Sequence, residues 1–181
     1  MEVKRIIVGA LETNCYLLAD GREMALIDPG GNFTKIGQAI EEMKKAQTAD
    51  LKYIILTHYH SDHTGSVTEV KSQFGGQILI SEAEKNYLDF KIDKFLADKE
   101  DIKIGDCQLK VSYTPGHSAG SICLIGENLI FTGDTLFASG YGRTDLEGGS
   151  EEEMKKSLAR LRQIIKPGMT VYPGHGEIFI A

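Results

Sequence analysis

Hydrophobic and polar positions along the chain divide it into short strands that occur in both halves. Aliphatic residues dominate at 3–8, 14–19 and 24–28, and Asp20-Gly21 between the last two runs is typical of a hairpin turn. Residues 53–57 (YIILT) form an unbroken apolar run, as expected of a strand that is buried on both faces. Further strands are predicted at residues 77–81, 107–113, 121–125, 129–132 and 169–172.

Helical periodicity occurs between these strands. In residues 34–45 the apolar positions recur at intervals of three and four, which predicts an amphipathic helix with a polar outer face. Residues 90–105 are polar, and no element is predicted there. The mixed order of strands and helices predicts an α/β fold in which residues 1–181 form a single domain. Further helices are predicted at residues 64–74, 82–89 and about 150–165.

Bulk composition narrows the classes of partner. Of the 181 residues, 41% are hydrophobic and 25% are charged, and the formal net charge is −6. An acidic surface disfavours binding along a phosphate backbone, so nucleic acid is not an expected partner. No apolar run approaches the roughly 20 residues that a membrane span needs, and residues 1–14 read as a first strand rather than a signal peptide. We therefore expect a cytoplasmic protein with no membrane partner.

The cysteines add no candidate chemistry. Cys15, Cys107 and Cys123 are odd in number and widely spaced, so they predict no disulfide framework. We expect them to be small buried side chains in a reducing compartment.

The segment THYHSDHTG (57–65) directly follows the apolar run at 53–57 and concentrates histidine in a chain that has only five. A lone histidine in a turn is usually solvated or hydrogen bonded, and a lone aspartate before a helix reads as a cap. Three imidazoles and a carboxylate gain nothing from packing together, and their charged forms would repel one another. A bound cation removes this conflict, and such donors suit zinc, iron or manganese. The candidate ligands here are His58, His60, Asp62 and His63.

The remaining donors follow other predicted strands in glycine-rich turns. His117 lies in YTPGHSAGS, Asp134 in IFTGDTLF and His175 in VYPGHGEI, and each taken singly is an ordinary turn residue. With the 57–65 segment they give seven candidate ligands, which are too many for one tetrahedral ion. They suit two ions that share a carboxylate, and Asp134 is the candidate for that role. No cysteine lies among them, so a closed cysteine-rich zinc site is not indicated.

These residues resemble the sequence motifs of the metallo-β-lactamase superfamily. THYHSDHTG matches the T-H-x-H-x-D-H signature, and TNCYLLAD, ALIDPGG, TPGHSAGS, FTGDTLF and YPGHG are similar to further motifs in the same order. The resemblance implies an αββα sandwich of two mixed β-sheets flanked by helices, with the metals at one edge. It also implies the ligands: His58, His60 and His117 for the first metal, Asp62, His63 and His175 for the second, and Asp134 as the bridge.

The resemblance further implies a dinuclear, metal-dependent hydrolase. Two divalent ions would lower the pKa of a shared water toward ~7, and the resulting hydroxide would attack a carbonyl. Zinc is the expected metal, and iron or manganese is also compatible with the ligands. Asp62 and Asp134 are the candidate catalytic residues beside this water.

Within the superfamily, the loop FTGDTLFASGYGRTDLEGG resembles that of the glyoxalase II-like (hydroxyacylglutathione hydrolase-like) thioesterases. A basic residue in their loop contacts the anionic end of glutathione, and Arg143 occupies its place; an exposed ion pair with Asp145 is the alternative for this residue. The chain ends soon after His175, without the C-terminal helical extension of glyoxalase II and without the tyrosine that follows its last histidine. We therefore expect a smaller or different thioester, or another thiol-containing small molecule, and leave a homodimer open.

Other functions of the same fold compete with this interpretation. A mononuclear iron persulfide dioxygenase is the main alternative, because its members carry a loop similar to GRTDL. A nuclease fits less well because of the net charge, and a true β-lactamase fits less well because Asp134 indicates the hydrolase branches. The intact set of donors disfavours a non-catalytic scaffold.

Overall fold

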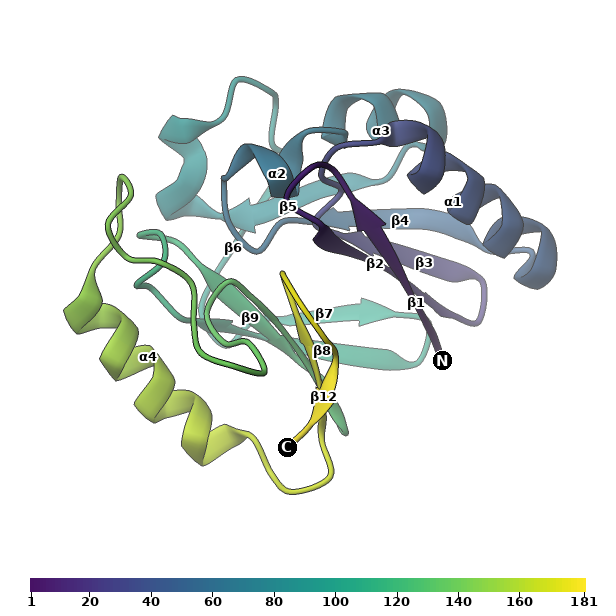
Figure 1. The fold of residues 1–181 in the computed structure, drawn as a ribbon. Helices are drawn as coiled ribbons and strands as arrows, with labels where there is room; N and C mark the ends of the chain where they lie inside the picture. The colour runs from purple at the N-terminus through teal and green to yellow at the C-terminus, as the bar shows by residue number, and fades with distance from the viewer.

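The computed structural model describes residues 1–181 and stacks two six-stranded β-sheets face to face, with helices on the outer side of each (Figure 1). The N-terminal half of the chain forms the first sheet, sheet A, and the C-terminal half forms the second, sheet B. This arrangement confirms the predicted αββα sandwich of two mixed sheets.

Sheet A keeps its six strands in chain order. The first three strands pair antiparallel, whereas the third to sixth pair in parallel and therefore need crossover connections. Its strands are β1 (Glu2–Val8), β2 (Thr13–Asp20), β3 (Glu23–Ile27), β4 (Asp50–Ile55), β5 (Gln77–Ser81) and β6 (Lys94–Leu96).

Sheet B has the order β12-β11-β10-β9-β8-β7. Strands β7 to β10 form an antiparallel meander, and β11 joins β10 in parallel after a helical crossover. β12 closes the edge antiparallel to β11. The strands are β7 (Asp101–Ile104), β8 (Cys107–Tyr113), β9 (Ile122–Ile125), β10 (Leu129–Gly133), β11 (Thr170–Pro173) and β12 (Phe179–Ile180).

The helices are α1 (Phe33–Gln47), α2 (Ser61–Thr64), α3 (Val67–Phe74) and α4 (Glu151–Ile164), with a 3₁₀ helix η1 (Glu82–Tyr87). The two long helices begin at side-chain caps, where Asn32 accepts from the N–H of Lys35 and Ser150 accepts from the N–H of Glu153. Three glutamates in the first turn of α4 complement the positive end of its dipole. None of these helices combines the length and hydrophobicity that crossing a membrane requires.

Three hydrophobic layers follow from the alternation of strand side chains. Along β2, Cys15 and Leu17 face the layer under α1 and α3, whereas Tyr16 and Leu18 face the layer between the sheets. A smaller third layer contains Leu161 of α4 and packs that helix against sheet B. The three cysteines are free; Cys15 and Cys123 are buried as predicted, whereas Cys107 is only half-buried because it begins β8 near the surface.

Three segments differ from the sequence-based expectation. The predicted helix at 64–74 is divided: α2 ends at Thr64, α3 begins at Val67, and between them the N–H of Ser66 donates to the carbonyl of Pro29 at 2.9 Å. Residues 90–105 contain β6 and β7, and 169–172 is not the last strand, because β12 follows it. β6 and β12 have only three and two residues, which is too short for a periodic signal, and β7 lies in a segment rich in charged residues, so their pairing partners define them.

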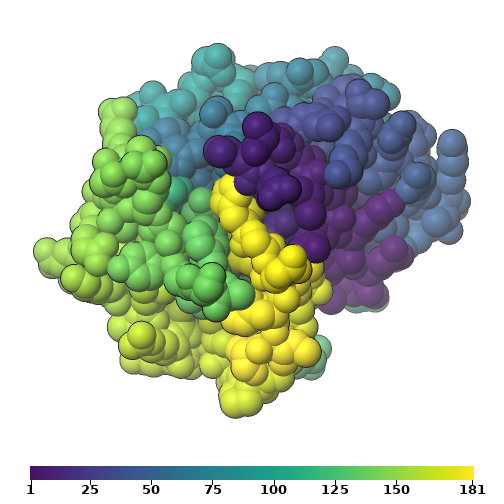
Figure 2. Space-filling view, in the orientation of Figure 1, coloured from purple at the N-terminus to yellow at the C-terminus, as the bar shows by residue number.

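The two halves of the chain meet along a seam on one face, where the C-terminal segment lies against the N-terminal segment (Figure 2). The side-chain amide of Asn14 donates to the carbonyls of Pro173 and Gly176, at 2.9 Å each. The hydroxyl of Tyr16 donates to the carbonyl of Pro173 at 2.6 Å. These bonds tie β2 of sheet A to the turn after β11 of sheet B and so fix the turn that carries His175.

Candidate metal centre

The seven predicted donors lie close after strand ends, five of them in loops and two, Asp62 and His63, in the short helix α2. Residues 58–63 follow β4 and run into α2, His117 follows β8, Asp134 follows β10 and His175 follows β11. Strands β8, β10 and β11 run in the same direction, so their ends meet at one edge of sheet B. The end of β4 lies at the same edge of the sandwich, and the structure therefore brings the seven donors together.

The first group of donors consists of three histidines. One ring nitrogen from each of His58, His60 and His117 lies within 4.8 Å of the others. His60 Nδ1 and His117 Nε2 are 2.8 Å apart, and the ring centroid of His58 is 4.8 Å from both of the other two. Three imidazoles at this spacing can hold one divalent ion.

The second group consists of one aspartate and two histidines. Asp62 Oδ2 lies 3.2 Å from His175 Nε2 and 3.4 Å from His63 Nε2. The two Nε2 atoms are 3.3 Å apart. These three donors can hold a second ion.

Asp134 lies between the two groups. Its Oδ2 is 3.5 Å from His117 Nε2 of the first group and 3.5 Å from His175 Nε2 of the second. Its Oδ1 is 3.4 Å from His63 Nε2. This position is compatible with a carboxylate shared by two ions, as the sequence predicts.

Buried polar atoms that lack a hydrogen-bond partner test whether these residues fit a cation. Four buried side-chain atoms have no hydrogen-bond partner, and three of them belong to the predicted ligands. Buried polar atoms are normally paired, because an unpaired one costs free energy. Their convergence in one place fits a site for a divalent ion. The three atoms are His58 Nε2, His60 Nε2 and Asp134 Oδ1.

Three further predicted ligands, two imidazoles and one carboxylate, form hydrogen bonds with the surrounding protein. His117 Nδ1 donates to the carbonyl of Arg143 at 2.7 Å, and His175 Nδ1 donates to the carbonyl of Leu11 at 3.1 Å. Asp62 Oδ2 accepts from the hydroxyl of Thr13 at 2.9 Å. Such partners fix the orientation of metal-binding groups and the nitrogen that carries the proton.

Asp28 and Thr57 have a function at the site that the sequence analysis missed. Asp28 is only 2% exposed, and it accepts from the Thr57 N–H at 2.8 Å, the Thr57 hydroxyl at 2.7 Å and His63 Nδ1 at 2.9 Å. Because the Thr57 hydroxyl donates to Asp28, its oxygen accepts from His58 Nδ1 at 3.0 Å. Asp28 also lies close enough to His58 and His63 to count as a donor, but these hydrogen bonds assign it to orienting them. An acid at the end of the apolar strand in ALIDPGG was the available signal.

Burial and charge move the histidine pKa values in opposite directions in the two groups. Burial, reinforced by the other imidazoles, holds the pKa of His58 well below its ordinary value and lowers that of His60 to about 4. Burial also opposes protonation of His63, but the carboxylates of Asp28 and Asp134 outweigh it and raise the pKa to about 9. His58 and His60 are therefore neutral at pH 7, whereas an ion at the second group must displace a proton from His63.

The other two members of the second group share this carboxylate-rich environment. Burial opposes ionisation of Asp62, but its hydrogen bond with His175 and the charge of His63 hold its pKa below the ordinary value. Burial lowers the pKa of His175, but the hydrogen bond to Asp62 and the charge of Asp134 raise it overall. Asp62 is therefore ionised at neutral pH.

Arg143 stands at the rim of the cleft that contains the donors. Its guanidinium is exposed and pairs with Asp145 through two hydrogen bonds of 2.7 Å. Its backbone carbonyl holds His117, so the residue contacts the candidate metal centre through its main chain. The cleft has a volume of about 510 Å³ and is lined by Leu11, His60, Ser61, Asp62, His117, Asp134, Phe137, Gly142, Arg143, Leu146 and His175.

Comparison with known families and proteins agrees with this geometry. The family model of the metallo-beta-lactamase superfamily matches residues 8–175. The chain is 35% identical over 165 residues to the probable polyketide biosynthesis zinc-dependent hydrolase PksB of Bacillus subtilis, covering 89% of this chain and 72% of that protein. It is 32% identical over 199 residues to the hydroxyacylglutathione hydrolase GloC of Haemophilus influenzae, covering 98% and 92%.

Solved structures show the same fold. The crystal structure of the BLEG-1 B3 metallo-beta-lactamase superposes with a TM-score of 0.88 at 28% sequence identity. The match covers 99% of this chain and 94% of that one, so all the layers of the sandwich correspond. The zinc-dependent relative and the groups of histidine and aspartate together indicate divalent metal ions.

Proposed function

The chain belongs to the metallo-beta-lactamase superfamily and is a metal-dependent hydrolase of it, and from this premise we propose that its substrates are small thioesters. The observation that carries the proposal is the convergence of six donors into two groups of three on either side of a seventh, Asp134, beside one open cleft. Similarity to a hydroxyacylglutathione hydrolase over 98% of the chain favours a thioester as the substrate class.

Two divalent ions are part of the proposal, with zinc as the first candidate because of the zinc-dependent relative. Bound ions of this kind supply a lowered pKa for coordinated water and polarise a substrate carbonyl. Imidazole and carboxylate donors are also compatible with iron or manganese. One ion would be held by His58, His60 and His117, the other by Asp62, His63 and His175, and Asp134 would be shared.

Two carboxylates are assigned to proton transfer. Asp62 is ionised at neutral pH, and its Oδ2 is already engaged by Thr13 and His175, so Oδ1 is the atom with free capacity. Asp134 Oδ1 is buried without a hydrogen-bond partner, and it lies 3.4 Å from His63 Nε2. An attacking water in the cleft could pass its proton to either atom.

Arg143 is proposed to bind the anionic end of the substrate. Its guanidinium reaches solvent at the rim of the cleft, and its present partner is the equally exposed Asp145. An exposed ion pair is weak, so a carboxylate of the substrate can replace Asp145 at little cost. A guanidinium also matches a carboxylate through two parallel hydrogen bonds. The proposed partner is thus a small anionic thioester, and the net charge of −6 disfavours nucleic acid.

The test is to measure the metal content of the purified protein together with a substrate panel. The panel contains glutathione and coenzyme A thioesters, a β-lactam, and glutathione persulfide with oxygen uptake as the readout. We expect about two divalent ions per chain and thioester hydrolysis, since the donors form two groups. Asp134→Asn should remove this hydrolysis, whereas Asp106→Asn, which changes an exposed acid outside the cleft, should not.

Two results would contradict the proposed substrate class. Hydrolysis of the β-lactam without hydrolysis of any thioester would assign the protein to the lactamase activity. One iron per chain with persulfide-dependent oxygen uptake would favour the persulfide dioxygenase instead.

A further inference from the structure

Glu84 is a buried carboxylate outside the seven donors. It lies in η1, its exposed fraction is 0%, and it forms no ion pair with a basic side chain. Instead it accepts three hydrogen bonds from uncharged donors. Oε2 accepts from the N–H of Tyr59 at 3.0 Å, and Oε1 accepts from the hydroxyl of Ser118 at 2.7 Å and from the N–H of Gly120.

The three donors belong to the two turns that carry the first group of histidines. Tyr59 is the residue between His58 and His60, and Ser118 directly follows His117. One turn follows β4 of sheet A and the other follows β8 of sheet B. The carboxylate of Glu84 therefore links the two turns by hydrogen bonds, and it does so outside the cleft that contains the donors.

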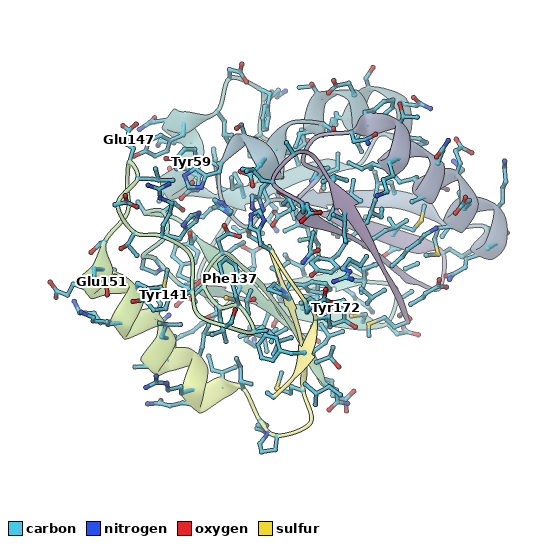
Figure 3. All side chains as sticks on the ribbon, viewed as in Figure 1. Tyr59, Phe137, Tyr141, Glu147, Glu151 and Tyr172 are labelled. Atoms are coloured by element: carbon cyan, nitrogen blue, oxygen red, sulfur yellow. The ribbon has the colours of Figure 1, made fainter.

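Close packing leaves these turns little freedom around the carboxylate. A Cβ atom at Gly120 would lie 2.6 Å from Glu84 Oε1, so the turn approaches as near as a glycine allows. Tyr59 is held on its other side, because its hydroxyl donates to the carbonyl of Glu147 at 2.9 Å (Figure 3) and its ring stacks on Tyr87 with centroids 4.2 Å apart.

A purely structural role does not account for the chemistry of this position. A buried carboxylate without a cationic partner is costly, and burial raises the pKa of Glu84 while the three hydrogen bonds oppose that rise. An apolar side chain or a neutral amide could fill the same volume. A cation held by three neutral imidazoles, in contrast, gains from a negative charge close behind its ligands.

We propose that Glu84 is a positioning residue for the three-histidine site. It fixes the position of His58 and His60 relative to His117. It also places a negative charge near three imidazole ligands that contribute no negative charge of their own. The proposal rests on the proposed metal sites and is independent of the thioester as substrate. Residues that orient metal ligands through hydrogen bonds strongly affect the affinity for the metal.

The test is the binding of Co²⁺ to metal-free protein, followed by absorption spectroscopy. Glu84→Gln keeps the shape, removes the charge and turns an amide N–H toward a donor. We expect one of the two Co²⁺ equivalents to bind roughly 10- to 100-fold more weakly, with an altered visible spectrum. Glu82→Gln is the matched control, since Glu82 is an exposed acid of the same 3₁₀ helix, and it should bind both equivalents as the wild type does.

Thermal unfolding of the metal-free variants separates positioning from general stability. Ser118→Ala removes one of the three hydrogen bonds but retains the charge, and it should give a smaller loss of Co²⁺ affinity in the same direction. If both variants unfold at a lower temperature but keep the wild-type affinity and spectrum, the proposal is overturned. Wild-type protein that binds no Co²⁺ would overturn the metal sites themselves, and the positioning role with them.

Discussion

Four of the five histidines form a hydrogen bond to the rest of the protein through Nδ1, and this leaves Nε2 as the nitrogen available to a ligand. Nδ1 donates to a carboxylate in His63, to a backbone carbonyl in His117 and His175, and to a threonine hydroxyl in His58. In the neutral ring the proton stays on Nδ1 and Nε2 presents a lone pair to the cleft, which for His63 requires that an ion first displace the second proton. The chain thus prepares its donors for a cation through contacts that lie outside the cleft.

Arg143 allows a prediction about single-residue function, because its main chain and side chain have separate contacts. Arg143→Ala removes the exposed guanidinium but retains the carbonyl that holds His117. We expect the KM for anionic thioesters to rise roughly three- to tenfold, which is the cost of one charge-assisted contact. The kcat and the metal content should not change, and steady-state kinetics with metal analysis would measure both.

Arg22→Ala is the control for this substitution. Arg22 is also exposed, and it lies in the turn between β2 and β3, at the end of those strands remote from the cleft. A thioester without a negative charge should be hydrolysed equally by both variants. An unchanged KM for every anionic substrate would show that Arg143 forms only its ion pair with Asp145.

The seven donors could be predicted from the sequence, whereas the groups that orient them could not. His58, His60 and Asp62 occur in one short segment of distinctive chemistry, so their residue types alone indicate a site. The partner of His117 is a backbone carbonyl, which every residue possesses, and it therefore has no sequence signal. Glu84 lies in an ordinary polar segment, and only the folded chain brings it behind the histidines.

At the scale of elements, strand ends and the turns after them build the centre. Each of β4, β8, β10 and β11 ends at a loop with at least one donor. Several of these turns approach so closely that a side chain would not fit. A Cβ atom at Gly174 would lie 2.2 Å from Asp134 Oδ1 and 2.8 Å from His63 Cε1. The spacing of the donors therefore depends on glycine in the turn after β11.

Gly174→Ala tests this dependence. The added methyl group must push Asp134 or the whole turn aside, and such overpacking typically costs about 1–3 kcal/mol. We expect the protein to fold, with a lower unfolding temperature, and to lose most of its metal because Asp134 lies between the two groups. Circular dichroism and metal analysis would measure the two effects.

Gly37→Ala is the matched control for the glycine substitution. A Cβ atom at Gly37 would make only ordinary contacts, the closest at 3.6 Å to Phe74, and Gly37 lies within α1. Alanine in a helix is more favourable than glycine by up to about 1 kcal/mol, so this variant should be slightly more stable and retain its metal. Full metal content in Gly174→Ala would contradict the assigned close packing.

Periodicity predicted the long elements well because their burial repeats. The strand at 107–113 and the helices at 34–45 and about 150–165 agree with β8, α1 and α4 to within a few residues. The short strands β6, β7 and β12 escaped prediction because hydrogen bonds to neighbouring strands define them, not an internal pattern. At the break between α2 and α3 the N–H of Ser66 donates to the carbonyl of Pro29, a tertiary bond that periodicity does not detect.

At the scale of the whole molecule, the candidate metal centre connects the two sheets. Residues 58–63 extend from sheet A, whereas His117, Asp134 and His175 extend from sheet B. Hydrogen bonds between the halves, such as those from Asn14 to the turn after β11, lie beside this centre. Ions bound by both sets of donors would act as cross-links, so metal binding and sheet packing should be coupled.

Removal of metal should therefore lower the stability of the whole protein. An ion that binds only the folded state, present at about 100 times its Kd, contributes about 2.7 kcal/mol. For a chain of this size that corresponds to a decrease of roughly 5–10 °C in Tm after chelation, measured by calorimetry.

Amide hydrogen exchange would locate the effect of chelation. Exchange should accelerate at 57–65 and at 173–176, the segments that carry His63 and His175, whose Nε2 atoms are 3.3 Å apart, and much less within α1, which lies on the outside of sheet A. Re-addition of zinc should restore both the Tm and the protection. His63→Ala is the control, because it lacks a donor of the second group and should respond less to the chelator. An identical Tm with and without chelator, in protein shown to have contained metal, would mean that the sheets are held by their apolar layer and the seam alone.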